Sequence, residues 1–176
     1  MTRHLYLVRH GEALPDESGL TERGRHQATQ LGQRLQDVVF NTIHHSPLPR
    51  AAQTAHLISE QLHHPAPLKP SEVAGDYIPY VPHPDELPPD SAAHYLDFLA
   101  QATPEELTTG PRLAQEALTH FTGPTDLLVT HNFLIAWLIR DALDAPPWRW
   151  LTINHANAAL TVLTYTPTRP TTVEHR

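Results

Sequence analysis

Arginine and histidine side chains recur at the ends of short apolar runs in this chain of 176 residues. Arg9 and His10 directly follow one run, and His131 directly follows another. Arg50 comes a few residues after a third run, in a segment that begins with prolines. If these runs are neighbouring strands, the four side chains meet at one edge of a sheet and form a compact positive pocket. Such a pocket suits a phosphate group, because guanidinium forks match its oxygens and imidazole rings add hydrogen bonds.

Helix N-termini are expected to strengthen this anion site. The segments beginning near Pro49 and Asn132 are predicted to be helices, whose first turns offer free N–H groups and a positive dipole end. Arg50 lies in the first turn of one of them, where the dipole disfavours a cation. A bound anion therefore explains Arg50 better than a solvated surface position does. The cluster also contrasts with the whole chain, whose formal net charge is −7.

Composition excludes several other chemistries. The chain has no cysteine, which removes disulfide frameworks, thiolate metal sites and thiol nucleophiles. Its acidic balance argues against general affinity for nucleic acid or anionic membranes. The most apolar stretch, residues 127–139, is shorter than the roughly 20 residues that span a bilayer. We therefore expect a soluble, cytoplasmic protein without nucleic-acid or membrane partners.

The chain has 14 histidines, an unusual number, and most of them lack a ligand pattern. His44 and His45 are adjacent on an expected strand, so their side chains point to opposite faces and cannot hold one ion. Neither a His-Glu-x-x-His motif, a Gly-x-x-x-x-Gly-Lys loop nor a Gly-x-Ser-x-Gly elbow occurs. We expect no metal and no cofactor, and assign only His10 and His131 to chemistry.

Strand and helix signals alternate along the chain. Thr21 is the expected N-cap of a helix whose apolar residues recur at intervals of three and four. Strands are expected over about 5–8, 41–45, 126–130 and 158–165, and further helices over about 49–62, 91–101, 111–121 and 132–143. This alternation predicts a single α/β domain over residues 1–176, a three-layer αβα sandwich with a mainly parallel sheet.

Proline density marks two segments that are expected to be irregular. Residues 65–89 contain eight prolines, which predicts an extended excursion without regular elements. Aromatic and aliphatic residues within it, such as Tyr77 and Tyr80, make it too apolar for a disordered linker. We therefore expect a packed, Pro-rich flap at about 65–90 that covers the pocket. Pro167 and Pro170 are expected to mark an irregular tail.

Four sequence blocks resemble the histidine phosphatase (phosphoglycerate mutase-like) superfamily. The Arg-His-Gly signature lies in Leu7–Glu12, and the other blocks are Leu20–Ala28, Ser46–Ala55 and Val129–His131. The triplet alone is a weak signal, but an ordered set over residues 5–131 is specific. The resemblance implies a phosphoglycerate mutase-like fold and a metal-independent phosphatase of the histidine acid type, which forms a phosphohistidine intermediate.

The same resemblance implies roles for individual residues. His10 would attack phosphorus as the nucleophile. Arg9, Arg50 and His131 would bind the phosphoryl oxygens and stabilise charge in the transition state, so His131 counts as catalytic as well. Asn132 stands where relatives commonly have Gly, and its side chain is expected to narrow the pocket or to donate another hydrogen bond to phosphate.

A carboxylic acid should protonate the leaving oxygen and later activate water. The family usually places a Glu about twenty residues after the second arginine, and this spacing points to Glu72 as the catalytic acid. Asp76 lies close enough in the sequence to be the acid instead, and the residues around both positions do not match the family pattern well. We predict Glu72 here, with Asp76 as the alternative.

Three functions fit these residues. Hydrolysis of a small phosphorylated substrate is favoured, because the chain is shorter than typical relatives with mutase activity. A phosphoglycerate mutase-type phosphotransferase and a non-catalytic phospholigand-binding module of the same fold are the alternatives. The sequence does not identify the substrate, and the apolar helix expected at 132–143 leaves a homodimer open as an alternative to a monomer.

Overall fold

A computed structural model describes residues 1–176, except for the side chains of Arg169 and Pro170. The strands form one sheet of six in the order β3-β2-β4-β1-β5-β6. Their bounds are Arg3–Arg9 (β1), Thr42–His45 (β2), Leu68–Pro70 (β3), Thr125–Thr130 (β4), Leu160–Thr166 (β5) and Arg169–His175 (β6). Strands β3, β2, β4 and β1 pair in parallel, whereas β5 pairs antiparallel with both β1 and β6.

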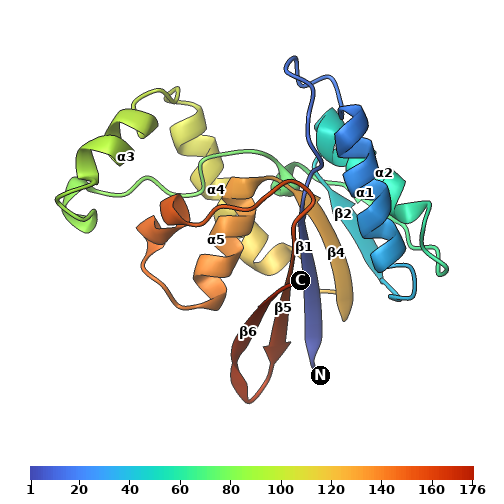
Figure 1. The fold of residues 1–176 in the computed structure, drawn as a ribbon. Helices are drawn as coiled ribbons and strands as arrows, with labels where there is room; N and C mark the ends of the chain where they lie inside the picture. Colours follow the sequence, from blue (N-terminus) through green and yellow to red (C-terminus); the bar gives the residue numbers. More distant parts are fainter.

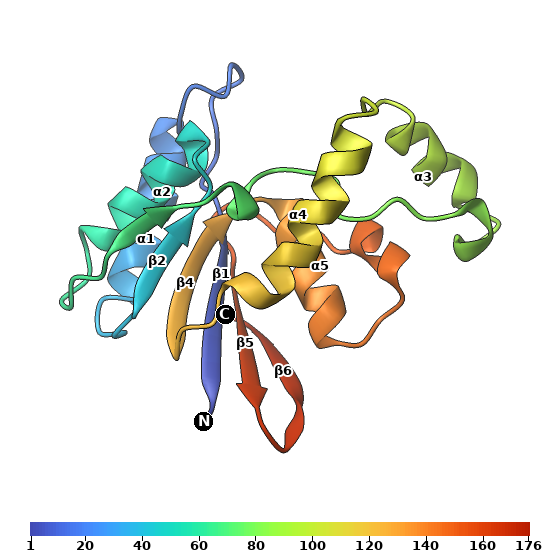
Figure 2. The same ribbon diagram turned by 180° about the vertical axis from the view of Figure 1, so that it is seen from behind.

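Helices cover both faces of this sheet. Helices α1 and α2 lie against one face, and α4 and α5 lie on the other (Figures 1 and 2). The helices are Glu22–Arg34 (α1), Pro49–Ser59 (α2), Ala92–Leu99 (α3), Glu106–His120 (α4) and Asn132–Ala142 (α5), with short 3₁₀ turns at Glu72–Ala74 (η1), Pro84–Glu86 (η2) and Pro147–Thr152 (η3). The predicted three-layer α/β sandwich with a mainly parallel sheet is confirmed.

Alternation along the central strands supplies both cores. Leu127 and Val129 of β4 pack into the cluster beneath α1 and α2, whereas Leu128 between them packs into the cluster beneath α4 and α5. All three residues are fully buried. Because successive side chains of a strand point to opposite faces, a strand between two helix layers is apolar on both sides. This burial fixes β4 in the middle of the sheet.

The parallel strands bring three segments to one sheet edge. β4 lies between β2 and β1, with Arg9 opposite Thr130 and His45 opposite Val129. The carboxyl ends of these strands are therefore level, and the next residues of the chain meet there. This edge is where ligands bind in open α/β sheets.

The expected tail is instead a strand. Residues Arg169–His175 form β6, which pairs antiparallel with β5. A proline is tolerated in an edge strand because only one side of the strand takes part in the ladder. The proline signal in this segment was therefore misleading, and β6 is one of two strands, with β3, that the sequence pattern did not predict.

Helix α4 begins earlier than expected, at Glu106 rather than near Pro111. A capping box explains this start: the backbone N–H of Thr103 donates to Glu106 Oε2 at 2.8 Å, and the N–H of Glu106 donates to Thr103 Oγ1 at 3.2 Å. The Thr-x-x-Glu pattern was visible in the sequence. Pro111 lies inside the helix, one turn after its start.

The Pro-rich segment also contains regular elements, contrary to expectation. β3 pairs in parallel with β2, and the short turns η1 and η2 follow it. Ile78 is buried in the core beneath α4 and α5, whereas Val81 is exposed. Proline is compatible with a short edge strand and with the first residue of a turn, so eight prolines did not preclude these elements.

Candidate active site

Arg50 is the central hydrogen-bond donor of the site. It lies in the first turn of α2 and is only 5% exposed, which excludes a solvated surface position. Its Nε donates to His10 Nε2 at 3.3 Å, its Nη1 to Glu17 Oε2 at 3.1 Å and its Nη2 to Asp76 Oδ2 at 2.8 Å. One guanidinium therefore joins the end of β1, the loop after it and the segment after η1.

His10 has the state required of an imidazole nucleophile. Its Nδ1 lies 2.8 Å from the carbonyl oxygen of Gly11. A carbonyl only accepts, so Nδ1 carries the proton and Nε2 keeps its lone pair. Burial, reinforced by the nearby charges of Arg50 and Arg9, lowers the pKa of His10 to about 4. The ring is therefore neutral at pH 7, with Nε2 facing the arginine.

His131 lies beside His10 at the N-cap of α5, with ring centroids 5.1 Å apart. The residue is 1% exposed, and neither ring nitrogen has a hydrogen-bond partner among the described residues. Burial, together with the charge of His10 and the arginines, lowers the pKa of His131 to about 2. Its Nδ1 lies 3.5 Å from Asp76 Oδ2. Because the ring is neutral, this contact is not an ion pair. A buried ring without partners is well placed to bind an oxygen of a ligand.

Asp76 is the carboxylate that the structure brings into the cluster. It contacts both Arg50 and His131. Burial raises the pKa of this carboxyl group, although the arginine acts in the opposite direction. A carboxyl group with a raised pKa beside a nucleophile has the properties of a general acid.

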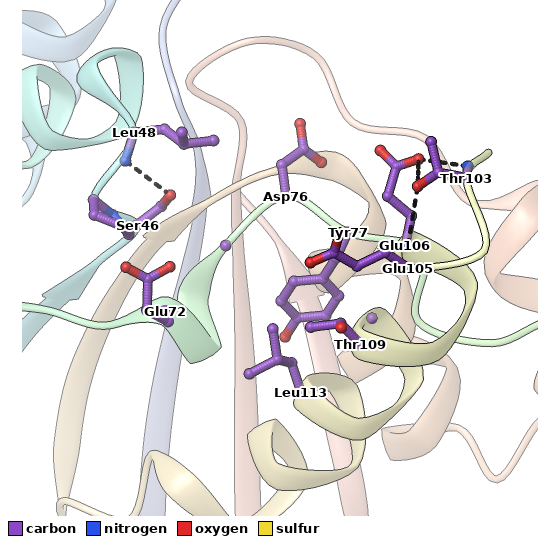
Figure 3. A pocket seen from close by; sticks show the side chains of 13 residues that line it. Ser46, Leu48, Glu72, Asp76, Tyr77, Thr103, Glu105, Glu106, Thr109 and Leu113 are labelled. Atoms are coloured by element: carbon purple, nitrogen blue, oxygen red, sulfur yellow. Dashed lines mark hydrogen bonds between the residues drawn. The ribbon is translucent and has the colours of Figure 1, made fainter. Parts of the chain in front are cut away.

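Glu72 lies elsewhere in the same region. Its side chain and that of Asp76 line one cavity of about 400 Å³, but they extend from separate places along the segment (Figure 3). Both carboxylates are exposed at this surface, but no hydrogen bond or ion pair among the described residues joins Glu72 to Arg50, His10 or His131. Of the two carboxylates considered from the sequence, Asp76 is the one in contact with the cluster.

Arg9 completes the cluster from the end of β1 and is held by the chain near residue 155. Its Nη1 donates to the carbonyl oxygen of His155. Burial lowers the pKa of Arg9, but a guanidinium stays protonated in proteins. Its buried Nε has no partner among the described residues, which leaves one N–H directed at no protein acceptor. Arg9 can therefore donate to a ligand while remaining fixed.

Asn132 forms hydrogen bonds to the backbone segment 153–155, which in turn accepts a hydrogen bond from Arg9. Its Oδ1 accepts from the backbone N–H of His155 at 2.8 Å, and its Nδ2 donates to the carbonyl oxygen of Ile153 at 3.3 Å. Both ends of the amide are thus engaged with one short segment of backbone. The amide nitrogen carries a second hydrogen, so a bond to phosphate is compatible with this arrangement.

Glu17 is a site residue that the sequence reasoning missed. It accepts from Arg50 although its own side chain is 68% exposed. Its backbone has φ of 58°, a left-handed conformation that is uncommon outside glycine and often found at functional loops. No local pattern in Pro15–Gly19 shows that this carboxylate turns back toward Arg50, 33 residues further along the chain.

The described residues lack two further features. They contain no group of three or more His, Asp or Glu residues that could hold a metal ion. No helix in this part of the chain is long and apolar enough to cross a membrane.

Fold and site together define an α/β protein in which two arginines and a buried histidine surround a second, neutral histidine at one edge of the sheet. A profile of the histidine phosphatase superfamily (branch 1) matches residues 5–72 and 110–176. Since this match covers most of the sequence, the chain belongs to that superfamily. The family expected from the four sequence blocks is therefore confirmed.

Individual relatives agree with this membership. A mitochondrial serine/threonine-protein phosphatase Pgam5 of Caenorhabditis briggsae is 33% identical over 178 residues, which cover 94% of this chain and 59% of the relative. The chain thus spans about three fifths of that protein's length. Among solved structures, a putative alpha-ribazole-5'-P phosphatase from Escherichia coli is 22% identical with a TM-score of 0.71, covering 98% of this chain and 95% of its own. A phosphoglycerate mutase from Bacillus anthracis is 22% identical with a TM-score of 0.68, covering 99% and 92%. These two structures show the shared fold.

Proposed function

We propose that this protein hydrolyses phosphomonoesters through a phosphohistidine on His10. The observation that carries the proposal is the ring of His10, which is neutral, has its proton on Nδ1 and presents Nε2 to Arg50. A nucleophile with a free lone pair lies beside a guanidinium that can bind the group under attack. The named phosphatases among the relatives support the same class of reaction.

The reaction has two steps. In the first, Nε2 of His10 forms a bond to phosphorus while the bond from phosphorus to the ester oxygen breaks, and this oxygen takes a proton. In the second, a water oxygen forms a bond to phosphorus, gives up a proton and displaces Nε2, which releases inorganic phosphate. Arg9, Arg50 and His131 bind the phosphoryl oxygens in both steps, with Asn132 as a further donor.

We assign the proton transfers to Asp76 rather than to Glu72. Asp76 is supported by its contacts with Arg50 and His131 and by its raised pKa. Its carboxyl group gives a proton to the leaving oxygen in the first step and takes one from water in the second. Glu72 remains the alternative, because it lines the same cavity.

The lining of the site favours hydrolysis over mutase chemistry. Among the described residues, the cavity that contains both Arg50 and Asp76 has no other Lys or Arg in its lining, so it offers little to a second anionic group of a substrate. The nucleophile and both arginines are present, which argues against a non-catalytic binding module. An experiment distinguishes this hydrolase from a phosphotransferase that retains its phosphorylated intermediate.

Substrate, partners and location belong to the proposal as well. We infer a small phosphorylated substrate, a flap at about 65–90 over the site, and no nucleic-acid or membrane partner, with a homodimer as the alternative to a monomer. A cytoplasmic location stays a prediction. The Pgam5 relatives are named mitochondrial, but this chain covers only 59% of the first of them.

Turnover of a broad panel of phosphomonoesters, in chelator-treated buffer, tests the activity. Wild type should release inorganic phosphate from an aryl phosphate, and His10→Ala should lose this activity. Transfer of the phosphoryl group to an added alcohol or sugar in preference to water would favour the phosphotransferase. A wild type that is inactive on every ester would refute the enzyme.

A further inference from the structure

The cavity beside the nucleophile is the place for the alcohol part of a substrate. It has a volume of about 410 Å³, and both Arg50 and Asp76 line it. Under the proposed function, on which this inference rests, the phosphoryl group binds to the arginine and the ester oxygen contacts the acid. The rest of the substrate must therefore extend from Asp76 into this cavity.

Part of the cavity wall is apolar. Phe98 of α3 and Phe133 of α5 meet edge to face with centroids 5.8 Å apart, and Leu48, Ile78 and Ala102 add aliphatic surface. Phe98 is 36% exposed, so part of its ring faces the cavity opening rather than the protein core. An apolar body of the size of one ring fits these walls and would cover the exposed Phe98 surface.

Apart from Arg50, the charged residues of the cavity wall are acidic. Apart from Arg50 and Asp76, its charged lining residues are Glu17 and Glu106. The carboxylate of Glu106 accepts from both the backbone N–H and the hydroxyl of Thr103, at 2.8 and 2.9 Å. These hydrogen bonds lower the pKa of Glu106, so it is anionic at neutral pH.

The neighbouring cavity has the same sign of charge. It shares Asp76 and Glu106 and adds the carboxylates of Glu72 and Glu105 (Figure 3). No Lys or Arg lines it among the described residues. The wall that faces a leaving group thus repels anionic substituents and attracts cationic ones, whereas the arginines are directed at the phosphoryl group.

We propose that this cavity selects phosphomonoesters whose alcohol carries an apolar body and a cationic amine, with Glu106 as the group that attracts the amine. Phosphorylated amino alcohols and phosphorylated side chains flanked by basic residues share this chemistry. Substrates with a second phosphate or a carboxylate are disfavoured. Glu106 touches no reacting atom in this account, so it sets specificity rather than the chemical step.

Three aryl phosphates of matched size test this proposal: 4-(aminomethyl)phenyl, 4-methylphenyl and 4-carboxyphenyl phosphate. Wild type should show the highest kcat/KM for the cationic ester and the lowest for the carboxylate. Glu106→Gln should lower the ratio of cationic to neutral kcat/KM by about threefold, the effect of one exposed ion pair. The adjacent Glu105→Gln is the matched comparison, because Glu105 lines only the neighbouring cavity, and it should lower the ratio less than Glu106→Gln does.

The inference and the proposed function fail in distinguishable ways. Turnover of all three esters with no charge preference, or with the same ratio in wild type and Glu106→Gln, overturns the inference and leaves the hydrolase in place. Absence of turnover refutes the hydrolase, and the affinities for two phosphonates then test the charge preference of the cavity. Calorimetry with 4-(aminomethyl)benzylphosphonate and 4-methylbenzylphosphonate should show tighter binding of the cation, reduced in Glu106→Gln. Equal affinities, or no binding of either, overturn the inference.

Discussion

The guanidinium of Arg50 lies against the ring of His10, with Nε donating to Nε2 at 3.3 Å. In the proposed mechanism, this contact occupies the lone pair that attacks phosphorus. A phosphoryl oxygen that accepts the arginine N–H would free Nε2 in the same movement, so the proposal couples binding of the phosphate to release of the nucleophile. The carbonyl oxygen of Gly11 meanwhile keeps the proton on Nδ1.

The hydrolysis rates of the two carboxylate variants, compared between good and poor leaving groups, identify the catalytic acid. Asp76→Asn should slow hydrolysis of an alkyl phosphate by about 100-fold or more, because a poor leaving group needs a proton from the acid. An activated aryl phosphate should be slowed far less. Glu72→Gln is the matched control and should leave both rates near wild type. The reverse pattern, with Glu72→Gln selective against alkyl esters, would assign the acid to Glu72.

The dependence of kcat/KM on pH should be bell-shaped with an acidic optimum. His10 must be neutral, and since its pKa is lowered to about 4, the rate should fall as pH drops through about 4. Asp76 must be protonated to act as the acid, so the rate should fall as pH rises through its raised pKa. Asp76→Asn should remove the high-pH limb. An alkaline optimum, or a high-pH limb that persists in this variant, contradicts the assignment.

Buried histidines should also make the fold sensitive to acid. Burial lowers the pKa of His10 and His155 to about 4 and that of His131 to about 2. Below the ordinary value near 6.5, the unfolded chain binds protons that the folded chain does not, so stability falls as pH drops from about 6.5 toward 4. Each ring contributes up to about 1.4 kcal/mol per pH unit. Thermal unfolding should show this loss, and His155→Gln should reduce the slope. A melting temperature that is constant from pH 6.5 to 4.5 would be inconsistent with neutral, buried rings.

Removal of the Asn132 side chain should weaken phosphate binding through Arg9. Asn132→Ala loses the hydrogen bonds that tie residues 153 and 155 to α5, and His155 then holds the guanidinium less firmly. We expect KM and the inhibition constant of inorganic phosphate to rise about 5- to 10-fold, with a smaller change in kcat. Thr152→Val is the control, because its hydroxyl donates to the carbonyl oxygen of Arg149 in the same turn and bonds to no residue of the site in the described part of the chain. Unchanged phosphate inhibition in Asn132→Ala would remove this role.

Much of the fold was predictable because its signals are local. Thr21 caps α1 by accepting from the N–H of Gly24 at 2.9 Å, as its place before an apolar periodicity predicts. The two strands that end at Arg9 and Thr130 lie between the two helix layers, and continuous apolar runs predict such strands. The predictions of secondary structure were wrong where a proline is compatible with two different structures. Pro111 was taken as the start of a helix that in fact begins at Glu106, and proline in β6 was taken as the end of order.

The site was predictable only where the chain's topology alone brings residues together. Arg9, His10 and His131 follow parallel strands, so the sheet forces them to one edge. The choice between Glu72 and Asp76 depends instead on which carboxylate, at the start of a single 3₁₀ turn or after it, reaches Arg50, and no local pattern encodes this contact.

Trapping of the phosphoenzyme is the most direct test of covalent catalysis at His10. Wild type is mixed with a phosphorus-labelled aryl phosphate, quenched within milliseconds and digested, and the label is mapped by mass spectrometry. The account predicts an acid-labile, alkali-stable phosphoryl group on Nε2 of His10, absent from His10→Ala and longer-lived in Asp76→Asn because water is no longer activated. A labelled phosphoenzyme that persists in His10→Ala, or rapid wild-type turnover without any trapped intermediate, would contradict it.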